Sequence, residues 1–301
     1  MSSARARPPD PAARPRLTYP QHPSNAYTDA PAISYAVAQG NAHLAPGAVK
    51  INLSGLLVGN GLTVPAAQYP KYAELAYNYS ITKLGHPVIT LRTYETMVRE
   101  LATCIPLIEQ CQTDTSVCAQ AQGVCNNAQI GPYEQTGLNP YDIRIPCEVP
   151  GLCYDESHVT AFFNEAATQK ALGVDQPWAA CNFDVNGQFS SDWMKQYAEP
   201  YVSSLLDAGI LVLIYAGDVD FICNWLGNQA WTLGLKWSGA ADFQKAPMAD
   251  WKLDDGTAAG QARSSGGLTF LRVYDAGHMV PADQPRAALE LLNTLTSGRA
   301  F

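Results

Sequence analysis

The segment Ile210-Leu-Val-Leu-Ile-Tyr-Ala-Gly-Asp-Val-Asp220 contains the clearest strand pattern of this sequence. Its first seven residues are apolar and uncharged, which predicts a buried strand. A second strand is predicted at residues 268–274, and it is followed by Asp275-Ala-Gly-His278. Helical patterns at residues 224–235 and 282–295 alternate with these strands. Such alternation predicts an α/β protein with a parallel sheet.

The N-terminal two-thirds adds a further strand and several helices to this pattern. Residues 51–58 alternate and then become continuously apolar, and the strand predicted there stops at the tight loop Gly59-Asn60-Gly61. Prolines at positions 8, 9, 11, 15, 20 and 23 indicate that residues 1–30 are a disordered or unrelated leader. The remaining predicted helices cover residues 32–39, 91–110, 159–172 and 193–206.

The composition excludes several classes of protein. Of the 301 residues, 47% are hydrophobic and 15% are charged, which is enough apolar surface for a sizeable core. The formal net charge of −8 disfavours a nucleic-acid partner, because an acidic surface repels phosphate. No apolar segment approaches the roughly 20 residues of a membrane-spanning helix, so no membrane partner is expected. Residues 1–23 also lack the apolar segment of a signal peptide.

Seven of the eight cysteines lie between residues 104 and 181. Their spacing contains no C-x-x-C, and no histidine lies between Cys104 and Cys153, so disulfides are favoured over a metal site. Disulfides indicate an oxidising compartment. The N-x-[ST] sequons at Asn52 and Asn78 agree with this compartment, whereas the lack of a signal peptide does not.

An acidic residue follows one predicted strand, and a histidine follows the next. The carboxyl ends of parallel strands meet at one edge of a sheet, so we expect the two loops to lie together. In α/β-hydrolases a serine, an acid and a histidine occur in this chain order, and the histidine takes the proton of the serine while the acid orients it. Simpler interpretations stay open: Asp218 and Asp220 as turn residues, and His278 as a surface histidine.

Residues 213–228 and 271–281 resemble the acid and histidine signatures of the serine carboxypeptidase family, in its carboxypeptidase Y-like branch. The resemblance covers about residues 31–298. It implies an α/β-hydrolase fold with a disulfide-stapled helical insertion, or cap subdomain, at about residues 80–190. Further matching segments occur in the family's order: Asn52-Leu53, Gly59-Asn-Gly-Leu-Thr63, Tyr141-Asp-Ile-Arg144, Cys181-Asn-Phe-Asp184 and Asp192-Trp-Met-Lys195.

The resemblance assigns roles to individual residues. It implies that Asp220 is the acid of the triad, that His278 is its base and that Asp218 is structural. It also implies the disulfides Cys104–Cys125, Cys111–Cys118 and Cys147–Cys153, leaves Cys181 and Cys223 unpaired, and favours Asn52 over Asn78 as a glycan site. Two groups of substrate-binding positions are matched, one for the residue before the scissile bond (Leu62, Tyr69, Trp193 and Ile222) and one for the departing residue (Tyr141, Tyr154, Cys223 and Met279).

The serine nucleophile of the family is not found in this sequence. The family places it in G-E-S-Y-A-G, and no G-x-S-x-G occurs here. Counting back from Pro31 places Ser24 at that position, but Pro23 precedes it and the flanking glycines are missing. Ser34, further along, is expected within a helix. We therefore expect a truncated family member, in which residues 31–301 form an α/β-hydrolase domain that is incomplete at its N-terminus.

The family's activity is the removal of C-terminal residues from peptides or proteins through an acyl-enzyme. The resemblance implies no metal and no cofactor, and a vacuolar, lysosomal or secreted location. Without a nucleophile, this chain is expected to be inactive. Two alternatives remain, an acyltransferase that passes the acyl group to an alcohol and an inactive peptide-binding homologue; the tyrosines and Cys223 favour the peptidase. The sequence carries no indication of oligomeric state.

Overall fold

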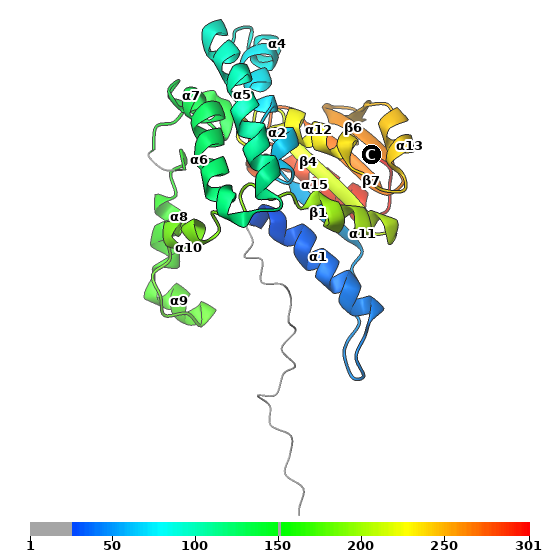
Figure 1. Ribbon diagram of the computed structural model, residues 1–301. Coiled ribbons are helices and arrows are strands. Elements are labelled where there is room, and N and C mark those ends of the chain that lie inside the picture. The colour runs from blue at the N-terminus through cyan, green and yellow to red at the C-terminus, as the bar shows by residue number, and fades with distance from the viewer. Residues whose placement is uncertain (1–25, 150–151) are drawn as a thin grey trace, which may run out of the picture.

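The computed structural model describes residues 26–149 and 152–301, and its centre is a five-stranded mixed sheet (Figure 1). The strands lie in the order β1-β4-β7-β6-β5. β1, β4 and β7 are parallel, whereas β6 and β5 run antiparallel to their neighbours. This arrangement confirms the predicted α/β class. The strands are β1 (Gly55–Gly59), β4 (Leu211–Gly217), β5 (Ala249–Lys252), β6 (Ala258–Ser265) and β7 (Leu268–Val273).

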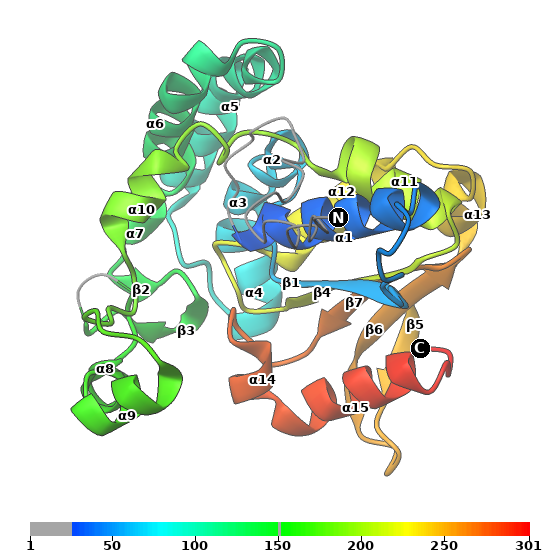
Figure 2. The same ribbon diagram turned by 90° about the horizontal axis from the view of Figure 1, so that it is seen from below.

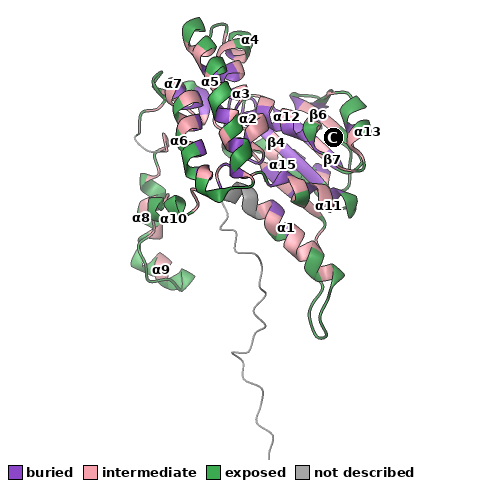
Figure 3. Ribbon diagram, viewed as in Figure 1, coloured by how far each residue is buried: buried purple, intermediate pink, exposed green. Residues whose placement is uncertain are grey.

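Helices cover both faces of this sheet (Figure 2). Side chains of β4 alternate between the faces: Ile214 packs in a cluster with Trp231, and Leu213 packs in another with Leu291. Most residues of β4 and β7 are accordingly buried (Figure 3). No helix in the described ranges is long and apolar enough to cross a lipid bilayer. One face carries α1 (Ala26–Ala42), α11 (Ser203–Asp207), α12 (Trp225–Gly234) and α13 (Ala240–Lys245), and the other α14 (Val280–Asp283) and α15 (Pro285–Thr296).

The segment between β1 and β4 forms a helical subdomain beside the sheet (Figure 1). Its two longest helices, α5 and α6, are joined by the Cys104–Cys125 and Cys111–Cys118 disulfides, and Cys147–Cys153 closes a loop further along. These are the pairings implied by the resemblance, and Cys181 and Cys223 are free. The elements are α2 (Pro65–Gln68), α3 (Lys71–Glu74), η1 (Leu75–Tyr79), α4 (Ser80–Leu84), α5 (Leu91–Cys111), η2 (Thr115–Val117), α6 (Cys118–Gln129), α7 (Gly131–Glu134), β2 (Leu138–Asn139), β3 (Asp142–Pro146), α8 (Ser157–Phe163), α9 (Ala166–Leu172) and α10 (Phe183–Gln188).

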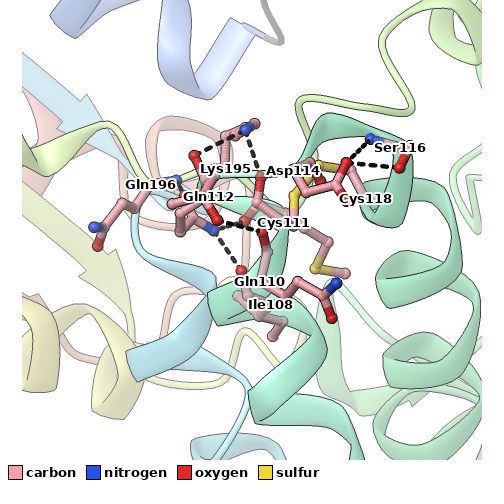
Figure 4. The surroundings of a disulfide bond; sticks show 11 residues. Ile108, Gln110, Cys111, Gln112, Asp114, Ser116, Cys118, Lys195 and Gln196 are labelled. Carbon is pink, nitrogen blue, oxygen red and sulfur yellow. Dashed lines mark hydrogen bonds between the residues drawn. A yellow bond between two sulfur atoms is a disulfide. The ribbon is translucent and has the colours of Figure 1, made fainter.

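Gln112, at the end of α5, ties this subdomain to the chain that leads back to the sheet (Figure 4). Its side-chain Nε2 donates to the carbonyl oxygen of Met194 at 2.7 Å, and its Oε1 accepts from the backbone N–H of Gln196 at 2.9 Å. The Lys195 ammonium donates to the carbonyl oxygen of Gln112 at 3.2 Å. These bonds satisfy carbonyl groups at the helix end and fix the segment that carries Trp193.

Two predicted helices are wrong in detail. Residues 193–206 form a π-helical turn, η3 (Ala198–Val202), followed by α11, with no helix over residues 193–197. Glu199 has φ −109° and ψ 126°, because the ring of Pro200 disfavours a helical conformation in the residue before it. The helix predicted at residues 159–172 is divided at Asn164 into α8 and α9. The Asn164 side chain donates to the carbonyl oxygen of Trp178 and accepts from its backbone N–H.

The predicted boundary between leader and domain is also corrected. The helix expected at residues 32–39 runs from Ala26 to Ala42 and includes Pro31. The last residues of the predicted leader are therefore helical. The reason is that the leader's prolines all precede residue 24, so none of them interrupts a helix that starts at Ala26. Residues 1–25, including Ser24, lie outside the described residues, and Ser34 lies in α1 with 8% of its surface exposed.

The antiparallel strands β5 and β6 are not among the predicted elements. β6 and β7 form a hairpin in which Ser265 pairs with Leu268. The two residues between them, Gly266 and Gly267, have φ values of 59° and 94°. A Gly-Gly pair between two strands is a sequence signal for such a turn, because glycine adopts positive φ without strain.

Candidate active site

The two loops singled out by the sequence lie side by side at the carboxyl ends of β4 and β7. The backbone N–H of Asp218 donates to Val273 at 2.9 Å, and that of Val219 donates to Ala276 at 3.0 Å. The loops meet at Gly217, where a Cβ atom would lie 2.2 Å from the carbonyl oxygen of Gly277. Any side chain at this position would separate the loops, which explains the glycine.

Asp220 and His278 face each other across these loops. The distance from His278 Nδ1 to Asp220 Oδ2 is 2.9 Å. The Asp220 side chain is fully buried, and that of His278 is 12% exposed. Burial lowers the pKa of the His278 ring, but the charge of Asp220 and its hydrogen bond outweigh this effect, so the pKa is raised above its usual value. The carboxylate also sets the tautomer, because it accepts the proton of Nδ1.

The raised pKa of His278 predicts a pH-dependent contribution to stability. A group whose pKa is higher in the folded state stabilises the fold fully below its unfolded pKa, about 6.5 for histidine, and loses that contribution as the pH rises through the folded value. The difference in free energy of unfolding between the unmodified chain and His278→Gln should therefore shrink from about pH 6 upward. Urea unfolding at a series of pH values measures it. A difference that grows with pH would contradict the assignment.

Asp220 is held by two further donors. Asn60 Nδ2 donates to Asp220 Oδ2 at 2.7 Å, and the backbone N–H of Cys223 donates to Oδ1 at 3.2 Å. Asn60 belongs to the Gly59-Asn60-Gly61 loop at the carboxyl end of β1, and it is not among the site residues expected from the sequence. The sequence contains a signal for this position, namely a tight loop directly after a predicted strand. Because β1 is parallel to β4, its end lies at the same edge of the sheet as the acid loop.

Asp218 has different hydrogen-bond partners from Asp220. Its Oδ2 accepts from Lys83, Tyr79 and Arg272 at 2.9, 3.0 and 3.2 Å, and its Oδ1 accepts from the backbone N–H of Asp275 at 2.8 Å. Lys83 also donates to the Asp275 carboxylate at 2.7 Å. Asp218 is thus the centre of a buried ion network that joins α4 to both site loops.

Tyr141, from the cap, contacts the histidine directly. Its carbonyl oxygen accepts the backbone N–H of His278 at 2.8 Å, and its ring lies edge-on to the imidazole with centroids 5.2 Å apart. The Tyr154 ring lies 5.7 Å from the Tyr141 ring. Cys223 lies next to Asp220, whereas Met279 is 43% exposed. Tyr141 and Cys223 therefore adjoin the pair, and Tyr154 adjoins Tyr141.

Leu62, Tyr69, Trp193 and Ile222 come together in one apolar cluster that also contains Cys223. Tyr69 is completely buried, and its hydroxyl donates to Asn126 Oδ1 at 2.6 Å and accepts from Trp193 Nε1 at 3.1 Å. Burial raises the pKa of this hydroxyl, so it stays protonated. The backbone N–H of Ile222 donates to Pro140 at 3.0 Å. The structure thus brings these four predicted residues into one region.

Three side chains could in principle hold a metal ion. The ligand atoms of Asp220, Cys223 and His278 all lie within 4.8 Å of one another. Two features oppose this use. The hydrogen bond between Asp220 and His278 already occupies one atom of each, and burial strongly raises the pKa of the Cys223 thiol, which must lose its proton to bind a metal. The arrangement fits an acid–base pair better than a metal centre.

Comparison with known proteins identifies the class of protein that this fold and site define. The family described as "Serine carboxypeptidase" matches residues 26–298, and the chain therefore belongs to the serine carboxypeptidase family. The fold is that of an α/β-hydrolase, as the resemblance implies. It is similar to the crystal structure of Kex1(Δ)p, a prohormone-processing carboxypeptidase from Saccharomyces cerevisiae, with a TM-score of 0.74 and 24% identity, over 91% of this chain and 60% of that one.

Similar curated proteins include the carboxypeptidase Y of Candida albicans, which is 46% identical over 254 residues. The carboxypeptidase Y of Komagataella phaffii is also 46% identical, and carboxypeptidase Y homolog A of Phaeosphaeria nodorum is 45% identical over 256 residues. Each alignment covers 82% of this chain but only 46–47% of the relative. The chain thus spans about half the length of the curated relatives it matches.

Proposed function

We propose that this chain carries the acid and the base of a serine carboxypeptidase, which removes the C-terminal residue of a peptide or protein. The observation that carries the proposal is the 2.9 Å contact between Asp220 and His278 at the ends of adjacent parallel strands. An oriented imidazole next to a buried carboxylate is the arrangement that activates a serine hydroxyl. No metal or cofactor enters this chemistry.

In the proposed mechanism, His278 accepts the hydroxyl proton at Nε2 while the serine oxygen attacks the scissile carbonyl. The imidazolium then gives this proton to the departing amine, and the acyl group stays on the serine as an ester. Water attacks the ester in the second half, again with His278 as base, which restores the serine. Asp220 remains ionised throughout, keeps the Nδ1 proton and stabilises the imidazolium.

The proposed substrate sites are formed by two groups of residues near this pair. The apolar cluster of Leu62, Tyr69, Trp193 and Ile222 would hold the side chain before the scissile bond, supported by its position next to Cys223. Tyr141, Tyr154, Cys223 and Met279 would surround the departing residue, supported by the contact of Tyr141 with His278. The tyrosine rings and the thiol favour a peptidase over an acyltransferase.

The nucleophile is the part of the proposal that this sequence does not supply, because no G-x-S-x-G occurs in it. We expect the 301-residue chain, as a separate polypeptide, to show no covalent labelling by a fluorophosphonate probe and no hydrolysis of N-blocked dipeptides. An acid–base pair alone gives little rate enhancement. Intact-mass spectrometry measures the labelling, with Candida albicans carboxypeptidase Y as the positive control.

Stoichiometric labelling of Ser24 would overturn this expectation and make the chain a complete enzyme. No labelling, together with tight binding of peptides that have a free C-terminal carboxylate, would favour the alternative of a peptide-binding homologue. Equilibrium binding of a peptide and its C-terminal amide distinguishes that case, because only the carboxylate form resembles a carboxypeptidase substrate.

We further propose an oxidising location for this chain, in a vacuole, a lysosome or the secretory route. The three disulfides support it, since such bonds are rare in the reducing cytosol. Asn52 is exposed outside regular structure, whereas Asn78 lies within η1, so Asn52 is the better acceptor for a glycan.

A further inference from the structure

The side chain of Asn60 links the acid loop and the histidine loop. Its Nδ2 donates to Asp220 Oδ2 at 2.7 Å and lies 3.4 Å from the carbonyl oxygen of Gly277, the residue before His278. The backbone N–H of Asn60 donates to Tyr215 in β4 at 2.8 Å. One residue just after β1 thus reaches both loops, although it lies 160 positions before Asp220 in the chain.

The orientation of this amide follows from its neighbours. Both groups next to Nδ2 accept hydrogen bonds, so the NH₂ end must point at them. Asn60 is 2% exposed, and its Oδ1 has no hydrogen-bond partner in the described part of the chain. A buried oxygen without a partner destabilises a fold. A role in packing alone does not account for an amide here, because an apolar residue would avoid that cost.

The backbone around Asn60 is adapted to present this side chain. Asn60 has φ 47°, a left-handed conformation that asparagine adopts more readily than most residues. Gly59 before it has no room for a side chain, because a Cβ atom there would lie 2.2 Å from Cζ of the Tyr215 ring. The chain thus passes close to the Tyr215 ring at the end of β1, and residue 60 follows with its side chain on Asp220.

We propose that Asn60 is a positioning residue of the active site, which holds the Asp220 carboxylate so that Oδ2 stays on Nδ1 of His278. This role rests on the proposed function. Asp220 Oδ2 accepts from both Asn60 and His278, and Oδ1 accepts from the backbone N–H of Cys223. A carboxylate held at both oxygens cannot rotate about its Cβ–Cγ bond. Without the Asn60 amide, the carboxylate keeps only the 3.2 Å contact at Oδ1 and the hydrogen bond to His278 itself, so no donor outside the Asp220–His278 pair holds Oδ2.

Asn60→Gly tests the proposal, because glycine keeps the left-handed backbone and removes only the amide. The first readout is the Nδ1–H proton of His278, observed by NMR in the 301-residue chain and assigned with His278→Gln. We expect its exchange with water to become at least about ten-fold faster. The second readout is kinetic, in a chimeric enzyme that joins residues 26–301 to the N-terminal half of Candida albicans carboxypeptidase Y. There kcat should fall about 10²-fold, with KM almost unchanged, because the base is misoriented.

Asp275→Gly is the matched control. Asp275 also has a left-handed backbone, with φ 55°, but its carboxylate contacts Lys83 and not Asp220. It should leave the Nδ1–H exchange as it is. Unchanged exchange in a folded Asn60→Gly chain would overturn the proposal. A chimera that is inactive even without substitutions, combined with faster exchange in Asn60→Gly, would reject the proposed function while supporting the positioning of Asp220.

Discussion

Replacing His278 by alanine in the chimeric enzyme is expected to lower kcat about 10⁶-fold, with a much smaller effect on KM. In the proposed mechanism the imidazole, held by Asp220, takes the serine proton, so its loss would remove both the base and the acid of the reaction. In serine proteases, loss of the histidine costs about as much as loss of the whole triad. Steady-state hydrolysis of an N-blocked dipeptide measures the effect.

The matched control is His158→Ala, which removes an exposed histidine of α8. It should leave kcat within about two-fold, since surface substitutions of this kind have small effects. If His278→Ala kept more than a few per cent of the activity, while the chimera remained folded by circular dichroism, His278 would not be the base.

Asp220→Asn is expected to lower kcat about 10⁴-fold. The asparagine amide would donate to Nδ1 instead of accepting from it, which moves the ring proton to Nε2 and leaves no acceptor for the serine. The substitution keeps the size and shape of the side chain, so the fold should be retained. The kcat of the variant at pH 7 measures the loss.

Asp255→Asn serves as the control for Asp220→Asn, because Asp255 is an exposed carboxylate whose ion pair is with Arg286. It should change kcat by less than about two-fold, in line with the small contribution of exposed ion pairs. Equal losses in the two variants would show that Asp220 affects activity through general destabilisation and not through the orientation of His278.

The central sheet and the proximity of the two site loops could be predicted because both depend on local sequence. The apolar run at β4 predicts a buried strand, and its alternation with the helical pattern of α12 predicts the α/β class. The proximity of the loops then follows, because parallel strands end at the same edge of a sheet. The disulfides, in contrast, followed from the family resemblance. Spacing alone leaves many pairings open for eight cysteines.

The errors came where a local pattern competes with contacts from elsewhere in the chain. Residues 193–206 have a helical apolar pattern, but Pro200 and the bonds of Gln112 to the preceding segment prevent the first turns. Asn60 lay in a recognised loop, yet its role depends on an amide contact between residues far apart in sequence. Such contacts follow from the register of β1 against β4, which local periodicity does not fix.

Labelling of the unsubstituted chimera by a fluorophosphonate tests most directly whether Asp220 and His278 can activate a serine that is supplied by the N-terminal half of a relative. We expect one probe molecule per chain, bound to the serine of the Candida albicans half, and release of the C-terminal residue from an N-blocked dipeptide. A folded chimera that neither binds the probe nor cleaves the dipeptide would contradict this expectation.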